Sequence, residues 1–220
     1  MSKTTTIAVG GMFVELITAG DAIARMTNNG KDWEPGTRSI WGALIKPGDC
    51  MIDVGAYTGV YSIASAMLGA KVIALEPHPA NYQRLRNNAA INSVRIEMIE
   101  AAASDQRGDQ SLYMKRGADT ICDTASLEGD QMVSVAVKAV RIDDLRLCAR
   151  VGLIKIDVEH HEASVLKGAL RTISSHRPAI VAEVLNEREL VRVDNVMACI
   201  GYRSNLVLDN RNRMYAYDDN

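Results

Sequence analysis

The sequence predicts an α/β fold: a Rossmann-like, mostly parallel sheet with helices on both faces and a C-terminal antiparallel hairpin. Two observations predict it. Between residues 50 and 200, short apolar segments alternate with longer segments of helical period. This alternation indicates a parallel sheet, because each parallel strand needs a crossover, usually a helix, before the next one. The chain then ends in two strand-like segments on either side of the polar turn Asp209–Asn212, which indicates the hairpin.

The first 49 residues precede this pattern and predict three small elements. These are a hairpin at Ile7–Ile17, a helix between Asp21 and Gly30, and a helix at Thr37–Leu44 that ends before a turn. A chain of 220 residues is long enough for one full core and short for two. We therefore expect residues 1–49 to act as lid elements beside one globular domain formed by residues 50–220.

The elements of the repeating part are defined by apolar runs and by the glycines and prolines that stop them. The predicted strands are Cys50–Val54, Lys71–Leu75, Ser93–Ile99, Ser111–Lys115, Met132–Val140, Leu153–Val158, Ala179–Val184, Tyr202–Leu208 and Met214–Tyr217. The predicted helices are Gly59–Leu68, Pro79–Asn92, Glu162–Ser174 and Glu187–Ile200. A loop is expected from Gly117 to Asp130.

Composition argues against several classes of protein. The chain is 47% hydrophobic and 24% charged with a formal net charge of −2, which disfavours nucleic acid and anionic membranes as partners. No signal-peptide pattern opens the sequence, and no apolar run has the length of a membrane span. The four cysteines form no CxxC pair, so we expect a reduced, cytoplasmic protein without a zinc site.

The strongest local signal is the glycine turn, Asp53-Val54-Gly55-Ala56-Tyr57-Thr58-Gly59, which follows one predicted strand and opens a helix. Glycines in such a turn let the backbone bend sharply and approach a ligand closely. The next strand is followed by Glu76, where this architecture places a carboxylate that accepts hydrogen bonds from ribose hydroxyls. Together they predict a site for an adenosine-containing cofactor. The alternative, that Gly55 and Gly59 only permit a tight turn, does not account for Glu76.

The spacing of the glycines distinguishes between two such cofactors. A nicotinamide site typically has GxGxxG, so that helix-terminal amides meet a pyrophosphate. Here the pattern is GxxxG, with Tyr57 in place of the second glycine and Asp53 two residues before the first. A carboxylate aimed at the turn would repel pyrophosphate and would suit the ammonium group of a methionine. The sequence therefore favours S-adenosylmethionine, and an NAD-dependent oxidoreductase is the alternative enzyme.

Several motifs between about residues 30 and 185 are shared with one family. They are Trp33-Glu34-Pro35, Met51–Gly59, Leu75–Pro79, the helix positions Leu85, Asn88 and Asn92, Ala101–Asp105, Val140–Leu145 and Ile154–Glu162. With these motifs the chain resembles the FkbM-type methyltransferases, whose most distinctive motif is IKIDVEGxE. The resemblance implies a class I methyltransferase fold, S-adenosylmethionine as donor, and a hydroxyl acceptor on a sugar, polyketide or other small metabolite. A homo-oligomer is left open.

The resemblance and the glycine turn together assign candidate site residues. The cofactor-binding candidates are Glu34, Asp53, Gly55, Ala56, Tyr57, Gly59, Glu76, Pro77, Ala102 and Asp157. The catalytic candidates follow the predicted Leu153–Val158 strand and are Asp157, Glu159, His160 and His161. Ligands bind at the carboxyl ends of such strands, and an alcohol has to lose a proton when it is methylated. A histidine could be the base, since it titrates near neutrality, and Asp157 could orient the acceptor or the methionine end of the cofactor.

One position departs from the family motif, because His160 stands where the family has glycine. His160 could supply a base or narrow the acceptor pocket, and we favour the second. If it blocked the acceptor, the protein would bind the cofactor without chemistry. Glu162 and one of the histidines could instead only cap the following helix. Asp157 and Glu159 could also bind a metal, but the sequence shows no further residues in a metal-ligand pattern.

Overall fold

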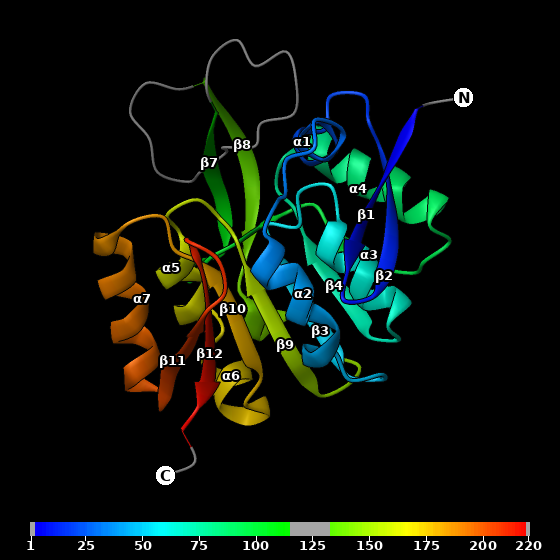
Figure 1. Cartoon of the computed structure of the whole chain (residues 1–220). Coiled ribbons are helices and arrows are strands. Elements are labelled where there is room, and N and C mark those ends of the chain that lie inside the picture. Colours follow the sequence, from blue (N-terminus) through cyan, green and yellow to red (C-terminus); the bar gives the residue numbers. More distant parts are fainter. Residues whose placement is uncertain (1–2, 115–132, 219–220) are drawn as a thin grey trace.

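The computed structural model describes residues 3–114 and 133–218. Its centre is a seven-stranded sheet in the order β11-β12-β10-β9-β3-β4-β5 (Figure 1). The strands are β3 (Cys50–Val54), β4 (Lys71–Leu75), β5 (Glu97–Ile99), β9 (Val151–Ile156), β10 (Ala179–Glu183), β11 (Tyr202–Val207) and β12 (Asn212–Tyr217). β3, β4, β5, β9 and β10 run parallel, whereas β12 and β11 are antiparallel additions at one edge. The predicted fold class is confirmed.

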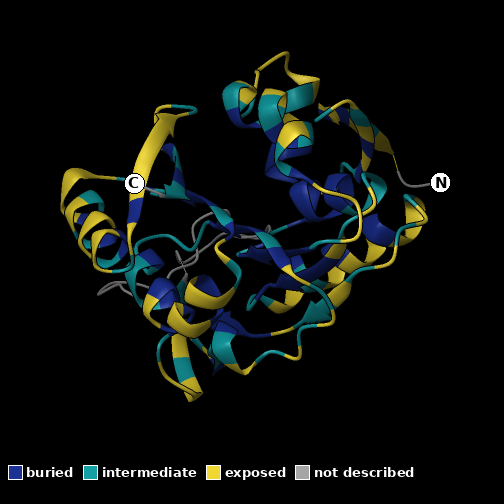
Figure 2. Ribbon diagram, turned by 90° about the horizontal axis from the view of Figure 1, so that it is seen from below, coloured by how far each residue is buried: buried dark blue, intermediate teal, exposed yellow. Residues whose placement is uncertain are grey.

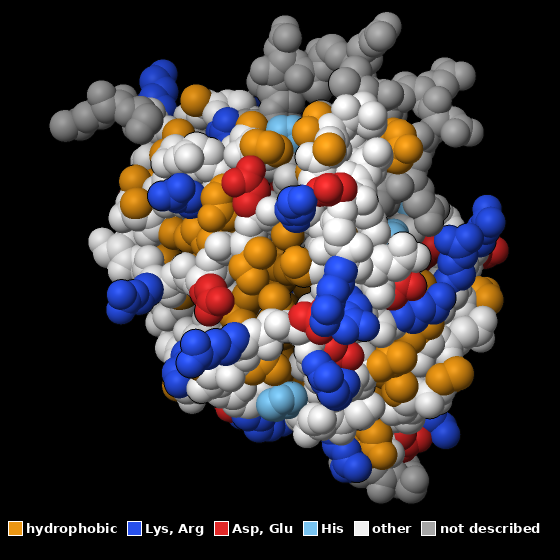
Figure 3. Space-filling view, turned by 180° about the vertical axis from the view of Figure 1, so that it is seen from behind, with side chains coloured by type: hydrophobic (Ala, Val, Ile, Leu, Met, Phe, Trp, Pro, Cys, Tyr) orange, Lys and Arg blue, Asp and Glu red, His pale blue; other side chains and the backbone are white. Residues whose placement is uncertain are grey.

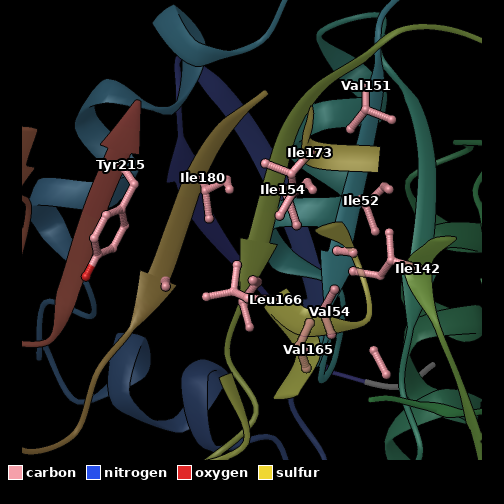
Figure 4. Packing of buried hydrophobic residues seen from close by; sticks show 14 of the residues in the cluster. Ile52, Val54, Ile142, Val151, Ile154, Val165, Leu166, Ile173, Ile180 and Tyr215 are labelled. Carbon is pink, nitrogen blue, oxygen red and sulfur yellow. The ribbon is translucent and has the colours of Figure 1, made fainter. Parts of the chain in front are cut away.

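Helices cover both faces of this sheet, and side chains alternate between the two faces along each strand. The helices are α1 (Ala22–Asn28), α2 (Pro35–Leu44), α3 (Val60–Met67), α4 (Pro79–Ile91), α5 (Glu162–Lys167), α6 (Leu170–His176) and α7 (Glu187–Cys199). On one face, Ile52, Ile154 and Ile180 pack against Leu166 and Ile173 of α5 and α6 (Figure 4). On the other face, residues such as Met51, Leu153 and Val181 pack against α3 and the N-terminal elements. Figure 2 shows the central strands buried between these two layers.

Two smaller sheets flank the central one. β1 (Thr4–Val9) pairs antiparallel with β2 (Met12–Ile17), and β2 contacts α3 and α4. β6 (Ala102–Ala103), β7 (Gly108–Met114) and β8 (Val133–Val140) form a three-stranded sheet that stands apart from the central one in Figure 1. The predicted loop from Gly117 to Asp130 lies outside the described residues.

Two predicted elements differ most from the structure in their extent. The predicted helix Glu162–Ser174 is two helices, α5 and α6, which part at Gly168. A Cβ atom at Gly168 would lie 2.0 Å from the carbonyl oxygen of Ser104, so the glycine permits a close approach of that backbone. The predicted strand Ser93–Ile99 is reduced to Glu97–Ile99, because Ser93 adopts φ 56° and turns the chain after α4.

The side chain of Asp209 links the N-terminal elements to the C-terminal hairpin. The carboxylate of Asp209, in the β11–β12 turn, accepts hydrogen bonds from the backbone N–H groups of Gly36 and Thr37, each 2.9 Å long. Asp209 therefore caps the start of α2, although it lies 172 residues after Thr37 in the sequence. α2 also begins at Pro35, two residues before the predicted start, as proline in the first turn allows.

The surface mixes charges of both signs. On the face shown in Figure 3, Lys and Arg side chains are scattered among acidic and hydrophobic ones, in keeping with the net charge of −2. Within residues 3–114 and 133–218, no helix combines the length and the apolar character needed to cross a bilayer.

Candidate active site

A cavity of about 380 Å³ opens at the carboxyl ends of β3, β4, β9 and β10. This is the edge at which open α/β sheets bind ligands. Most of the predicted site residues line it: Glu34, Asp53, Gly55, Ala56, Tyr57, Glu76, Pro77, Ala102, Asp157, Glu159 and His161. Two predicted residues, Gly59 and His160, are not among the lining residues.

The two glycines of the glycine turn have different roles. Gly55 adopts φ 77°, and a Cβ atom there would lie 1.8 Å from the carbonyl oxygen of Asp157. Gly55 thus lets the turn pass against the segment after β9, which brings Asp53 and Asp157 to one cavity. A Cβ atom at Gly59 would lie 2.3 Å from Cδ1 of Leu85. The missing side chain of Gly59 thus makes room for α4, and a contact of Gly59 with the cofactor stays a prediction.

Glu76 is held at the end of β4 by the glycine turn itself. Its Oε2 accepts a hydrogen bond from the backbone N–H of Tyr57 (2.8 Å), and its Oε1 accepts one from that of His78 (2.9 Å). Burial raises the pKa of Glu76 to about 7, although both hydrogen bonds favour the ionised form. A ligand that donates hydroxyl hydrogen bonds would favour the ionised form further.

Asp53 carries a buried acceptor atom. Only 1% of the residue is exposed, and its Oδ2 accepts a hydrogen bond from the Ser62 hydroxyl (2.6 Å). Its Oδ1 has no hydrogen-bond partner among the described residues. Burial raises the pKa of this carboxyl, and the nearby Lys155 opposes the rise. Because unpaired buried acceptors are costly, this atom fits a cavity that is completed by a donor on a ligand.

Tyr57 explains why the turn lacks a glycine at its centre. The residue adopts φ 51°, and its phenol oxygen accepts a hydrogen bond from the backbone N–H of Ala22 (3.2 Å). The side chain thereby ties the start of α1 to the glycine turn. Ile23 and Met26 of α1 line the same cavity.

Lys155 also lines the cavity and is not among the predicted site residues. Its ammonium group is 2.9 Å from Oδ2 of Asp157 and 5.1 Å from the centre of the Tyr61 ring. Burial on its own lowers the pKa of Lys155, but the carboxylates of Asp157, Glu34 and Asp53 outweigh burial and raise it. The side chain is therefore a fixed positive charge among several acids. The hydroxyl of Tyr61 donates to Glu34 (2.6 Å), which holds that acid at the wall.

Glu183, the last residue of β10, is a second unpredicted member of the cavity wall. It is hydrogen-bonded to Asp157, and Arg211 lies 4.0 Å from its Oε1. Burial and the adjacent Asp157 carboxylate raise the pKa of Glu183 to about 9. The pKa of Asp157 is lowered despite its burial, because Lys155 and Glu183 stabilise its ionised form.

The segment after β9 places its histidines on different sides. Glu159 and His160 have φ values of 52° and 80°, and Oε1 of the buried Glu162 accepts hydrogen bonds from the amides of Val158 and His160, each 3.3 Å long. The family glycine therefore corresponds to a left-handed backbone position. Nδ1 of His160 lies 3.4 Å from the side-chain amide of Asn186. His160 is not among the residues that line the cavity, and a role in narrowing the acceptor pocket stays a prediction.

His161 is the histidine that lines the cavity. Its Nε2 lies 3.0 Å from the hydroxyl oxygen of Ser104, which fixes the ring. His161 is also the N-cap residue of α5, but its side chain makes no capping hydrogen bond. Glu162 accepts the amides of Val158 and His160, which precede α5, so the alternative in which Glu162 and a histidine cap this helix is not borne out.

The sequence profile described as "Methyltransferase FkbM domain" matches residues 53–204. The chain belongs to the FkbM methyltransferase family. S-adenosylmethionine is accordingly its cofactor, and the unpartnered oxygen of Asp53 together with Glu76 fits that ligand. The alternative of an NAD-dependent oxidoreductase is left without support.

This FkbM-family chain matches part of the length of its relatives. The 31-O-demethyl-FK506 methyltransferase FkbM of Streptomyces tacrolimicus is 30% identical over 176 residues, 65% of this chain and 68% of the relative. The hexuronic acid methyltransferase AglP of Haloferax volcanii is 29% identical over 136 residues, 60% of this chain and 55% of the relative. The crystal structure of methyltransferase FkbM from Methylobacillus flagellatus KT has a TM-score of 0.55 and 22% identity, and the match covers 80% of this chain and 49% of that one. The chain thus spans about two thirds of the first relative and about half of the other two.

Proposed function

We propose that this chain transfers a methyl group from S-adenosylmethionine to a hydroxyl oxygen of a small metabolite or sugar. One observation carries the proposal: Asp157, Glu159 and His161 line the same cavity as the cofactor candidates. All three are groups that accept a hydrogen bond or a proton from a hydroxyl. The names of two relatives, an O-demethyl-FK506 methyltransferase and a hexuronic acid methyltransferase, support hydroxylated small molecules as the class of acceptor.

The cofactor end of the cavity is assigned as follows. Oδ1 of Asp53 accepts a hydrogen bond from the methionine ammonium group, and Glu76 accepts hydrogen bonds from the ribose hydroxyls. Pro77 and Ala102 supply apolar surface for the adenine ring. When bound, S-adenosylmethionine supplies a methyl group on a positively charged sulfur that is already a good leaving group, so the protein mainly has to position the reactants.

The acceptor end is formed by the residues after β9. Asp157 accepts a hydrogen bond from the reacting hydroxyl and orients its oxygen. His161 takes the hydroxyl proton as the new carbon–oxygen bond forms, and the contact of its ring with Ser104 fixes the orientation of the ring. Lys155 keeps Asp157 ionised, so Asp157 is an acceptor of hydrogen bonds rather than a donor.

We also assign a covering role to residues 1–49, beside a methyltransferase domain at residues 50–220. Three contacts support it: Tyr57 binds the start of α1, Tyr61 binds Glu34, and Asp209 binds the start of α2. α1 and the segment before α2 thereby wall the cavity on one side.

The test is turnover on a panel of acceptors. The purified chain is incubated with S-adenosylmethionine and hexuronic acid glycosides, hydroxylated polyketides, and amines of similar size. We expect S-adenosylhomocysteine to form together with an acceptor that has gained one methyl group on oxygen. The variant His161→Ala should lose roughly 10²–10⁴-fold in rate with unchanged affinity for S-adenosylhomocysteine. Methylation of the amines alone would overturn the assignment to a hydroxyl.

A further inference from the structure

Asp157 and Glu183 stand next to each other at the ends of two neighbouring strands. The register of β9 and β10 pairs Ile156 with Ala182, so the next residues along the two parallel strands are Asp157 and Glu183. Both line the cavity, and their side chains are hydrogen-bonded to each other. The Asp157 side chain is 24% exposed and that of Glu183 13%, so a ligand in the cavity can reach both.

The hydrogen bond between the two carboxyl groups requires a proton on one of them. Two adjacent carboxylates do not both ionise at neutral pH, and the proton belongs to the pair until its surroundings place it. Lys155 donates to Asp157 over 2.9 Å, whereas Arg211, the cation paired with Glu183 in the described part of the chain, is 64% exposed and 4.0 Å away. The stronger ion pair places the charge on Asp157 and the proton on Glu183.

The other charged groups that face the pair do not change this placement. Glu159 adds a negative charge and favours the neutral form of Glu183. Glu34 interacts with both Lys155 and Asp157, and its own pKa is raised by burial. The buried, unpartnered oxygen of Asp53 in the same cavity independently indicates a ligand there.

We propose that Glu183 is a positioning residue for methyl transfer: as a neutral acid it donates a hydrogen bond to Asp157 and holds that carboxylate where it accepts the hydroxyl of the acceptor. The inference rests on the proposed O-methylation. An ionised Glu183 would repel Asp157 and leave two negative charges beside Lys155. A neutral Glu183 leaves one negative charge, which Lys155 balances, and it leaves lone pairs of Asp157 free for the acceptor.

The first test measures the proton without any acceptor. In protein labelled with ¹³C at the glutamate carboxyl carbons, the resonance that disappears in Glu183→Gln identifies Glu183. We expect this resonance to titrate far above pH 4.5, and to titrate at lower pH in Asp157→Asn, which removes the neighbouring charge. A titration of Glu183 near the ordinary glutamate value of about 4.3 would overturn the proposal. This result is independent of whether the chain methylates anything.

The second test compares three side chains at position 183 on an acceptor found in the panel. Glu183→Gln keeps a neutral donor, so it should retain most of the turnover and lose any fall in rate above the pKa of Glu183. Glu183→Ala should lose about ten- to a hundredfold in kcat/KM for the acceptor, with unchanged affinity for S-adenosylhomocysteine. If Glu183→Gln is as inactive as Glu183→Ala, Glu183 acts as an ionised base and the proposal fails. If no compound of the panel is methylated, the proposed function fails, while the carboxyl titration still decides the state of the pair.

Discussion

The protonation of Glu76 should control how tightly S-adenosylhomocysteine binds. The pKa of Glu76 is about 7 in the free protein because of burial, and ribose hydroxyls that donate to the carboxylate would lower it in the complex. The affinity for S-adenosylhomocysteine is therefore greatest well above pH 7, and it falls as the pH drops through that value. With a pKa of about 7 the carboxyl is roughly nine-tenths ionised at pH 8 and one-tenth at pH 6, so the dissociation constant should rise about tenfold between them.

Calorimetry on wild type and Glu76→Gln measures this effect. The variant should bind more weakly at pH 8, by roughly 1.5–3 kcal/mol, and should lose most of the dependence on pH. Glu97→Gln, an exposed change on β5, is the matched control and should behave as wild type. Burial lowers the pKa of the neighbouring His78, and any titration that persists in Glu76→Gln belongs to a group other than Glu76. Identical pH profiles for wild type and Glu76→Gln would refute the assignment of Glu76 to the ribose.

Three further predictions follow from the geometry. Gly55→Val should abolish binding of S-adenosylhomocysteine and lower the melting temperature, because the new Cβ atom meets the Asp157 carbonyl. The control is Gly48→Ala, at another positive-φ glycine but with open space around it. It should lower the melting temperature only by the backbone strain and leave binding unchanged. Asp209→Ala should cost about 1 kcal/mol in denaturant unfolding and weaken cofactor binding, since α2 loses its cap; unchanged stability would contradict that role. His160→Gly should raise the unfolding free energy by up to about 1 kcal/mol without widening the range of acceptors, and faster methylation of bulkier acceptors would instead support a pocket-narrowing role.

The fold could be predicted because its signals are local. Apolar runs, their stops and a cap such as Asp21, which accepts from the amide of Ala24, fix each element within a few residues of the chain. One error involves a distant contact: the Ser104 backbone passes against Gly168, where α5 ends, and nothing near Gly168 in the sequence indicates this neighbour. The other error, at Ser93, comes from a left-handed backbone conformation in a residue other than glycine, which is uncommon.

In the candidate site too, residues with a local signal could be predicted, and residues whose role depends on distant neighbours could not. Asp53 and Glu76 could be predicted because each lies at the carboxyl end of its own strand, beside a recognisable turn. The role of Glu183 depends instead on which residue the neighbouring strand places beside it. Lys155 has a recognisable signal in the sequence, because a lysine inside the apolar strand Val151–Ile156 is costly to bury unless acids surround it. Because side chains two residues apart share one face of a strand, that lysine implies partners at Asp157 and on the neighbouring strands. A buried charge in an apolar strand therefore indicates an acidic cluster at the ligand edge of the sheet even before the strand order is known.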